Sequence, residues 1–322
     1  MRSQTRLFDT VGALSVICWV LILGSFVYQE YLSAPPETTS TAISTSNAIT
    51  ITEGQSWFVL SRENKDVGFI HESRTRVDES WLFEHEMVMQ VELAGSLQLL
   101  KTHTRATLDS TGILQKFQGD MNSFMGTFTA TGEVADNTIH VDVDLGQRSF
   151  SRDIPLNAPP KLSNTAINQL VANPELLKEN QRYEHEYFDP MQQQMSTLAY
   201  RYIEQKEVEV YGNTFQAYHF RQELMGDELD VYVNADGEVL IQEFPMKTVA
   251  SQLPDTLGKS HTSGLRKKLE KETRSAPQLP SPSNKPSEAQ GINGMLKNIS
   301  SLMKTSASDT PADMGTSSDS DM

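Results

Sequence analysis

The feature that most constrains this chain is a long stretch in which apolar and polar residues alternate. The alternation extends from about residue 49 to residue 253 and is interrupted by Gly, Asn and Asp. Successive side chains of a β-strand point to opposite faces, so this period predicts strands, and the small polar residues predict turns. We therefore predict a mainly β domain at 49–253, folded as a long antiparallel meander that forms a curved sheet or a half-barrel.

Individual elements follow from the same pattern. The last hairpin is the clearest, because Asn234-Ala-Asp-Gly237 separates two alternating runs, and Asp109-Ser-Thr-Gly112 has the same layout. One short covering helix is predicted from Ser163 or Asn164 to Val171, between prolines that begin and end it. The predicted strands are 57–62, 67–77, 81–93, 97–108, 113–118, 124–134, 138–143, 198–211, 214–222, 229–233 and 239–244.

A second constraint is the uncharged, mostly apolar segment at residues 10–29. At about 1.5 Å per residue, a helix of this length crosses a hydrocarbon layer of roughly 30 Å. Arg2 and Arg6 precede the segment and no Lys or Arg follows it until Arg62. The positive-inside rule then places residues 1–9 in the cytoplasm and the main domain outside. A cleavable signal needs small residues at −3 and −1, but the −3 residue before Pro35 is Leu32, and a proline directly after the cleavage point is unfavourable. We therefore predict an uncleaved single-pass anchor in the inner (plasma) membrane and a periplasmic domain.

The segments that flank the β domain have a different composition. Residues 30–48 are rich in Ser, Thr, Ala and Pro and are predicted to form a flexible linker. Residues 254–322 are predicted to be a mostly disordered tail, apart from a short amphipathic helix at 291–304. One face of that helix forms a candidate docking surface for a partner protein. It consists of Ile292, Met295, Leu296, Ile299, Leu302 and Met303.

Charge and cysteine content exclude several classes of function. Residues 49–251 contain sixteen basic and thirty-one acidic side chains, which equals the net charge of −15 of the whole chain. Such a domain repels nucleic acid and favours solubility or basic partners. Cys18, within the apolar segment, is the only cysteine. The predicted exterior part therefore has no disulfide, no cysteine metal ligand and no cysteine nucleophile.

Motifs that suggest catalysis or metal binding are incomplete. The dipeptide His-Glu occurs at residues 71, 85 and 185, but no second histidine stands four residues later, as a zinc protease requires. Asn234, Asp236, Gly237 and Glu243 match part of a calcium loop, yet Tyr232 occupies its first ligand position, and a hairpin turn explains the same residues. We predict no cofactor, no metal and no catalytic residues, and thus no enzyme.

Three short motifs suggest a family. The stretch from Trp57 to Asp66-Val-Gly68, the sequence Tyr187-Phe-Asp-Pro190 and the segment 231–240 resemble the β-rich domain that precedes transglutaminase-like domains in some bacterial envelope proteins. The resemblance covers about 49–253 and implies the periplasm of a Gram-negative bacterium. A transglutaminase-like centre needs a nucleophilic cysteine, so the resemblance does not extend to that activity.

Three functions remain as hypotheses. The first is a membrane-anchored, non-catalytic binding or scaffold module that docks an envelope protein through the surface at 291–304. The second is a carrier or sensor of a lipophilic ligand, since a curved antiparallel sheet with a covering helix can enclose an apolar cavity. The third is a hydrolase built from Asp, Glu and His side chains on strands.

Overall fold

The structure is a computed structural model that describes residues 41–42, 51–93, 95–123, 126–146, 148–156, 158–162, 165–189, 193–224 and 227–276. These residues belong to a compact unit that begins at residue 41. Within them, neither helix combines the length and the apolar character needed to cross a bilayer. The predicted transmembrane segment at 10–29, most of the linker at 30–48 and the amphipathic helix at 291–304 lie outside the described residues.

Fifteen strands of the described part form one sheet, and β2–β15 pair antiparallel with their neighbours. The short β1 (Thr41–Ala42) pairs parallel with β10. The first group of strands comprises β2 (Gly54–Arg62), β3 (Lys65–Val77), β4 (Ser80–Leu93), β5 (Ser96–Leu108), β6 (Leu114–Ser123), β7 (Gly126–Ala135), β8 (Thr138–Asp144) and β9 (Ser149–Pro155).

The second group follows a crossing segment that contains α2 (Thr165–Val171) and a 3-10 turn, η2 (Pro174–Leu176). It comprises β10 (Arg182–Asp189), β11 (Gln194–Val210), β12 (Asn213–Leu224), β13 (Asp227–Val233), β14 (Val239–Phe244) and β15 (Thr248–Leu253). The chain then ends its described part in α3 (Asp255–Ser275).

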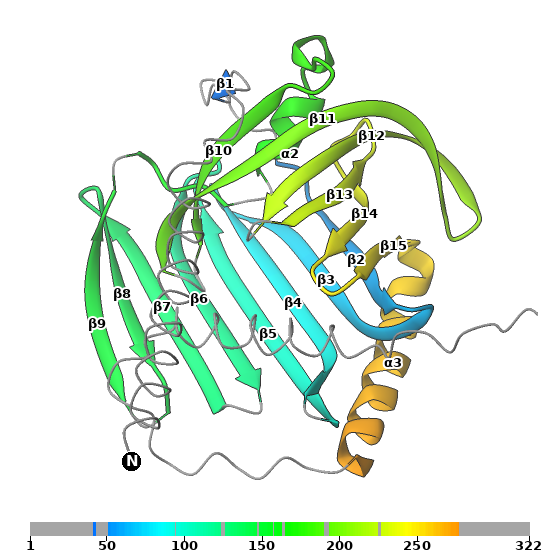
Figure 1. The fold of residues 1–322 in the computed structure, drawn as a ribbon. Coiled ribbons are helices and arrows are strands. Elements are labelled where there is room, and N and C mark those ends of the chain that lie inside the picture. The colour runs from blue at the N-terminus through cyan, green and yellow to red at the C-terminus, as the bar shows by residue number, and fades with distance from the viewer. Residues whose placement is uncertain are drawn as a thin grey trace, which may run out of the picture. The chain divides into compact units, whose positions relative to one another are not determined.

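The two groups are consecutive meanders joined through one ladder, because β15 pairs with β2. The sheet therefore continues from β10 through β15 and β2 to β9, and Figure 1 shows it bending so that β10–β13 arch across one end of the first group. Backbone contacts hold this curvature. Phe188 N on β10 donates to Lys161 O at 2.9 Å, and Leu114 N at the start of β6 donates to Pro160 O at 2.9 Å.

The mainly β prediction and the antiparallel meander are confirmed. All eleven predicted strands occur, with ends shifted by a few residues, and the predicted helix is α2. The two similar turns are also confirmed: Asp109 Oδ1 and Asn234 Oδ1 each accept hydrogen bonds from backbone N–H groups two and four residues ahead. Gly112 and Gly237 take φ values of 84° and 82°, a conformation that favours glycine.

Besides the two-residue β1, three strands were not predicted. In β9 all residues except Ile154 are exposed, so the strand shows no apolar alternation. In β10 charged residues and tyrosines alternate, and β15 is short and carries polar residues between its apolar ones. Strand β9 is held by ladder hydrogen bonds to β8, whereas β10 and β15 also bury side chains such as Tyr183, Phe188 and Leu253 in the core.

The expectation of a disordered tail from residue 254 differs from the structure, since α3 occupies residues 255–275. Only two leucines, Leu265 and Leu269, point into the core, and the other buried positions of the helix are Gly258 and Thr262. A Cβ atom at Gly258 would lie 2.3 Å from the Trp57 ring, so the helix lies directly on that indole. The small residues allow close packing. Because Gly258 and Thr262 are not large apolar residues, the sequence of α3 lacks the apolar periodicity that predicts a helix.

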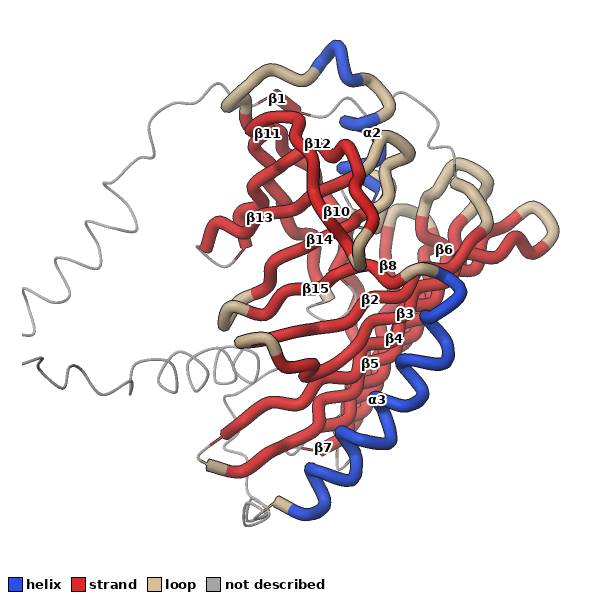
Figure 2. The backbone as a smooth tube through the Cα atoms, turned by 90° about the vertical axis from the view of Figure 1, so that its right-hand side faces the viewer, coloured by secondary structure: helices blue, strands red, loops and turns tan. Residues whose placement is uncertain are grey.

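The helix α3 covers one face of strands β2–β5, as Figure 2 shows. This face, called the outer face below, contributes Trp57, Val59, Phe69 and Val88 to a cluster with the two helix leucines. The opposite or inner face of the same strands contributes Phe58, Leu60 and Ile70 to a second cluster. Strand β2 is therefore buried on both sides, which explains its nearly continuous apolar run.

Candidate ligand-binding cavity

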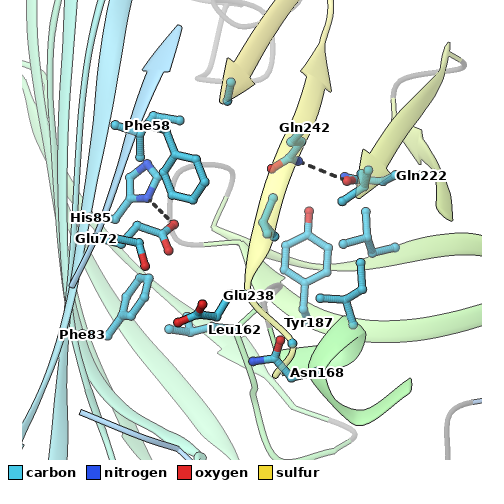
Figure 3. Close-up of a pocket in the computed structure, with 18 of the residues that line it drawn as sticks. Phe58, Glu72, Phe83, His85, Leu162, Asn168, Tyr187, Gln222, Glu238 and Gln242 are labelled. Carbon is cyan, nitrogen blue, oxygen red and sulfur yellow. Dashed lines mark hydrogen bonds and ion pairs between the residues drawn. The ribbon is translucent and has the colours of Figure 1, made fainter. Parts of the chain in front are cut away.

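The curved sheet encloses a cavity of about 390 Å³ on its inner face. One wall comes from β2–β5 and the other from β10–β15, and α2 with the segment before it lies between them. Figure 3 shows side chains of both walls pointing toward one another. Residues more than 150 positions apart in the sequence, such as Phe58 and Phe244, thus line one site.

Eleven of the 24 lining residues are apolar. Strand alternation explains this, because every second residue of a half-buried strand points inward. The apolar lining residues are Phe58, Ile70, Phe83, Leu162, Ile167, Phe188, Leu198, Val231, Val239, Phe244 and Ala250.

A pair of polar side chains, Glu72 on β3 and His85 on β4, lies on the first wall. Their Cα atoms are register partners, and His85 Nδ1 is 3.1 Å from Glu72 Oε1. Both side chains are more than two-thirds buried. The second carboxylate oxygen, Oε2, accepts no hydrogen bond from any described residue. The pair therefore offers a free acceptor to the cavity.

Glu72 is held in its charged form. Burial raises the pKa of its carboxyl, but the hydrogen bond and the charge of His85, with smaller effects from Arg74 and His71, bring the pKa below its ordinary value of 4.5. A carboxylate that accepts a hydrogen bond from a nearby donor is stabilised in its ionised form. At neutral pH Glu72 consequently carries a negative charge.

Amide and phenol groups stand on the second wall. Gln242 Nε2 on β14 donates to Gln222 Oε1 on β12 at 3.3 Å, and Figure 3 shows Tyr187 beside them. Burial and the charge of Asp189 raise the pKa of Tyr187 to about 12, although a hydrogen bond with Ser196 lowers it in part. The phenol is therefore neutral at physiological pH and is available as a donor.

The helix α2 completes the lining from one side. Ile167 and Asn168 line the cavity, whereas Leu170 and Val171 pack into the cluster beneath β10–β13. Asn168 also touches the last hairpin, because a Cβ atom at Gly237 would lie 2.9 Å from Asn168 Oδ1. The predicted covering helix thus lies at the cavity and contacts the turn that positions Glu238.

The three His-Glu dipeptides have separate places in the fold. Those at residues 71 and 85 are reciprocal neighbours across the β3–β4 hairpin: Glu72 meets His85 on the inner face, while His71 and Glu86 are register partners on the outer face. His71 stacks on Trp57, with ring centroids 3.7 Å apart. His185 on β10 is buried outside the cavity lining.

The other candidate residues do not form a site in the described part of the chain. Asn234, Asp236 and Gly237 form the predicted hairpin turn, and the Asn234 side chain bonds to the backbone of that turn. Among the described residues no group of three or more His, Cys, Asp or Glu side chains could hold a metal ion. The six apolar residues of the docking surface at 291–304 lie outside the described residues, and that surface stays a prediction.

Sequence reasoning did not identify the cavity residues as a set. The register of the β3–β4 hairpin was accessible, because a turn at Asp78-Glu79 pairs Val77 with Ser80 and so Glu72 with His85. The second wall gave no such signal. Tyr187, Gln222 and Gln242 lie on three strands whose approach to β3 depends on the curvature of the whole sheet.

No protein-family model matches the chain, and no curated protein matches it. Among solved structures, a β-barrel-like protein of the domain of unknown function DUF1849 from Brucella abortus aligns with a TM-score of 0.46 and 10% sequence identity, over 62% of this chain and 94% of that chain. A DUF1089 family protein from Pseudomonas aeruginosa aligns with a TM-score of 0.31 and 15% identity, over 55% of this chain and 90% of that chain. These comparisons do not assign the chain to a family.

Proposed function

We propose that this chain is a non-catalytic carrier or sensor that takes a small lipophilic molecule into its cavity. The cavity carries the proposal: about 390 Å³ of space whose lining combines aliphatic and aromatic side chains with ten polar or charged ones. Pockets of roughly 300–1,000 Å³ are typical of sites for small molecules. A molecule with an apolar body and one polar end matches both the walls and the polar pairs.

The arrangement around His85 favours binding over hydrolysis. A serine or threonine nucleophile needs a histidine within hydrogen-bond reach as its base. Within the described residues, the hydrogen bond to Glu72 is the one that His85 makes, and no hydroxyl group bonds to the ring. Among the described residues the pair is therefore not coupled to a serine or threonine nucleophile, and we assign it a role in recognising a ligand.

Native mass spectrometry tests the proposal most simply. All five hydrophobic clusters lie between Ile51 and Leu269, so protein that begins at residue 41 contains the complete folded unit. This protein, purified from bacterial extract without detergent, is expected to carry a discrete added mass. A clean mass, together with no uptake of decanol on titration, would contradict the proposal.

Filling the cavity provides a matched control. Val239→Trp places an indole on the cavity wall, and Val77→Trp places the same group at a position that is 49% exposed at the end of β3. Decanol binding should fall at least tenfold in the first variant and stay unchanged in the second. Equal binding by both variants would show that the ligand occupies another surface.

We also propose that the domain acts on the periplasmic side of the inner membrane, held there by the segment at 10–29. The charge pattern of Arg2, Arg6 and Arg62 supports this, as does the resemblance to bacterial envelope proteins. Alkaline phosphatase fused after Ala276, so that α3 is kept, should be active, and a cytoplasmic fluorophore at the same place should be dark. An inactive phosphatase with a bright fluorophore would reverse the orientation.

A further inference from the structure

We propose that the ligand carries a positively charged amine at its polar end and that Glu72 binds this group. The inference rests on the proposed function, because it names the chemical class of the molecule that the cavity takes. The hydrogen-bonding capacity left open on Glu72 and the charges that line the cavity both support it.

The first argument is the charge of the lining. Three carboxylates, Glu72, Asp189 and Glu238, line the cavity, against one guanidinium, Arg74. Charges enclosed by low-dielectric walls act more strongly on a ligand than charges in open water. A cationic end is therefore attracted to this space, whereas an anionic end meets an excess of like charge.

The second argument is the geometry at Glu72. His85 occupies Oε1 at 3.1 Å, which fixes the carboxylate, while Oε2 accepts no hydrogen bond from a described residue. An ammonium group offers three donors and no acceptor, so it complements a free carboxylate oxygen. The apolar side chains of Phe58 and Phe83 lie close to the pair in Figure 3 and suit the first carbons of an attached chain.

The test compares decylamine, decanol and decanoate, which share one tail and differ in the polar end. An alkyl ammonium is charged near neutral pH in the same way as lysine. Titrated calorimetrically into protein that begins at residue 41, decylamine should bind about tenfold more tightly than decanol. Decanoate should bind more weakly than decanol.

Two variants assign the preference to one residue. Glu72→Gln keeps the size of the side chain and should bring decylamine binding to the level of decanol, while unchanged decanol binding would show that the cavity is intact. Glu92→Gln removes the same charge from an exposed position outside the lining and should keep the tenfold preference. This control separates a specific contact from the general attraction of an acidic protein for cations.

The outcomes distinguish the two proposals. If none of the three molecules binds, the cavity is not a binding site and the proposed function fails. If all three bind equally to the wild-type protein, the proposed function stands and the amine assignment is overturned. Tighter binding of decanoate would overturn it as well. A preference for decylamine that persists in Glu72→Gln would place the amine on another residue.

Discussion

Trp57 is confined on two sides. Its ring stacks on His71 at 3.7 Å, and a Cβ atom at Gly258 of α3 would lie 2.3 Å from it. Alanine favours a helix over glycine by about 1 kcal/mol, but overpacking a filled core costs about 1–3 kcal/mol. Gly258→Ala should therefore lower the free energy of unfolding by up to about 2 kcal/mol in urea denaturation.

Gly264 provides the matched control for that substitution. It lies in the same helix, is exposed, and a Cβ atom there meets no atom within 4 Å. Gly264→Ala should therefore raise the free energy of unfolding by up to about 1 kcal/mol. The same sign of change for both glycines would show that α3 does not rest on Trp57.

His185 makes stability dependent on pH. Burial, followed by the charge of Lys161, lowers its pKa from 6.5 to about 4, although a hydrogen bond with the Leu162 backbone raises it slightly. The unfolded chain binds the proton first as the pH falls, so the wild-type protein loses stability between pH 6.5 and about pH 4. A shift of this size corresponds to about 3 kcal/mol.

His185→Gln should remove this dependence. The difference in free energy of unfolding between the wild-type protein and the variant should stay constant above pH 7 and shrink as the pH falls toward 4. Urea denaturation at several pH values measures the difference. A difference that is independent of pH would show that His185 titrates alike in the folded and unfolded chains.

Among the elements, α3 should be essential for the stability of the folded domain, although the sequence composition predicted disorder at its residues. Without it, Trp57, Val59, Phe69 and Val88 would lose their cover on the outer face. Protein that ends at Pro254 should therefore unfold at a much lower urea concentration than protein that ends at Ala276, and it should bind a hydrophobic dye. Equal midpoints of unfolding would mean that the helix contacts the sheet without stabilising it.

The apolar contacts of α3 should matter more than its ion pairs. Leu269 is fully buried, and Leu269→Ala should cost about 2–4 kcal/mol. Glu270 lies 2.7 Å from Lys101, but both side chains are partly exposed, so Glu270→Gln should cost less than about 1 kcal/mol. Larger destabilisation by Glu270→Gln would contradict this order of contributions.

The accuracy of the sequence prediction follows the environment of each element. Strands with one buried face, such as β13 with Leu229, Val231 and Val233, show the alternation and were predicted. The edge strand β9 has little apolar surface to bury, and α3 buries a glycine and a threonine, so neither shows its period. Local pattern predicts an element only where packing requires apolar residues at regular positions.

For the whole molecule, the cavity results from the pairing of β15 with β2 and from the segment 158–162 before α2, whose backbone bonds to β6 and β10. Both are long-range features that no local pattern encodes. The sequence predicted a curved sheet with a covering helix, and it predicted a lipophilic ligand as one hypothesis. It could not bring Tyr187 and Gln242 opposite Glu72, because their approach depends on how far the entire sheet bends.

A titration of isotope-labelled protein with decanol, followed by amide chemical shifts, tests the central claim most directly. The account predicts saturable shifts confined to the cavity lining, at residues such as Ile70, Thr104, Ile167 and Gln242. Residues on the exposed side of α3, such as Lys267 and Lys271, should not shift. Shifts that do not saturate, or that gather on α3 instead of the inner face, would contradict the claim that the sheet encloses a ligand site.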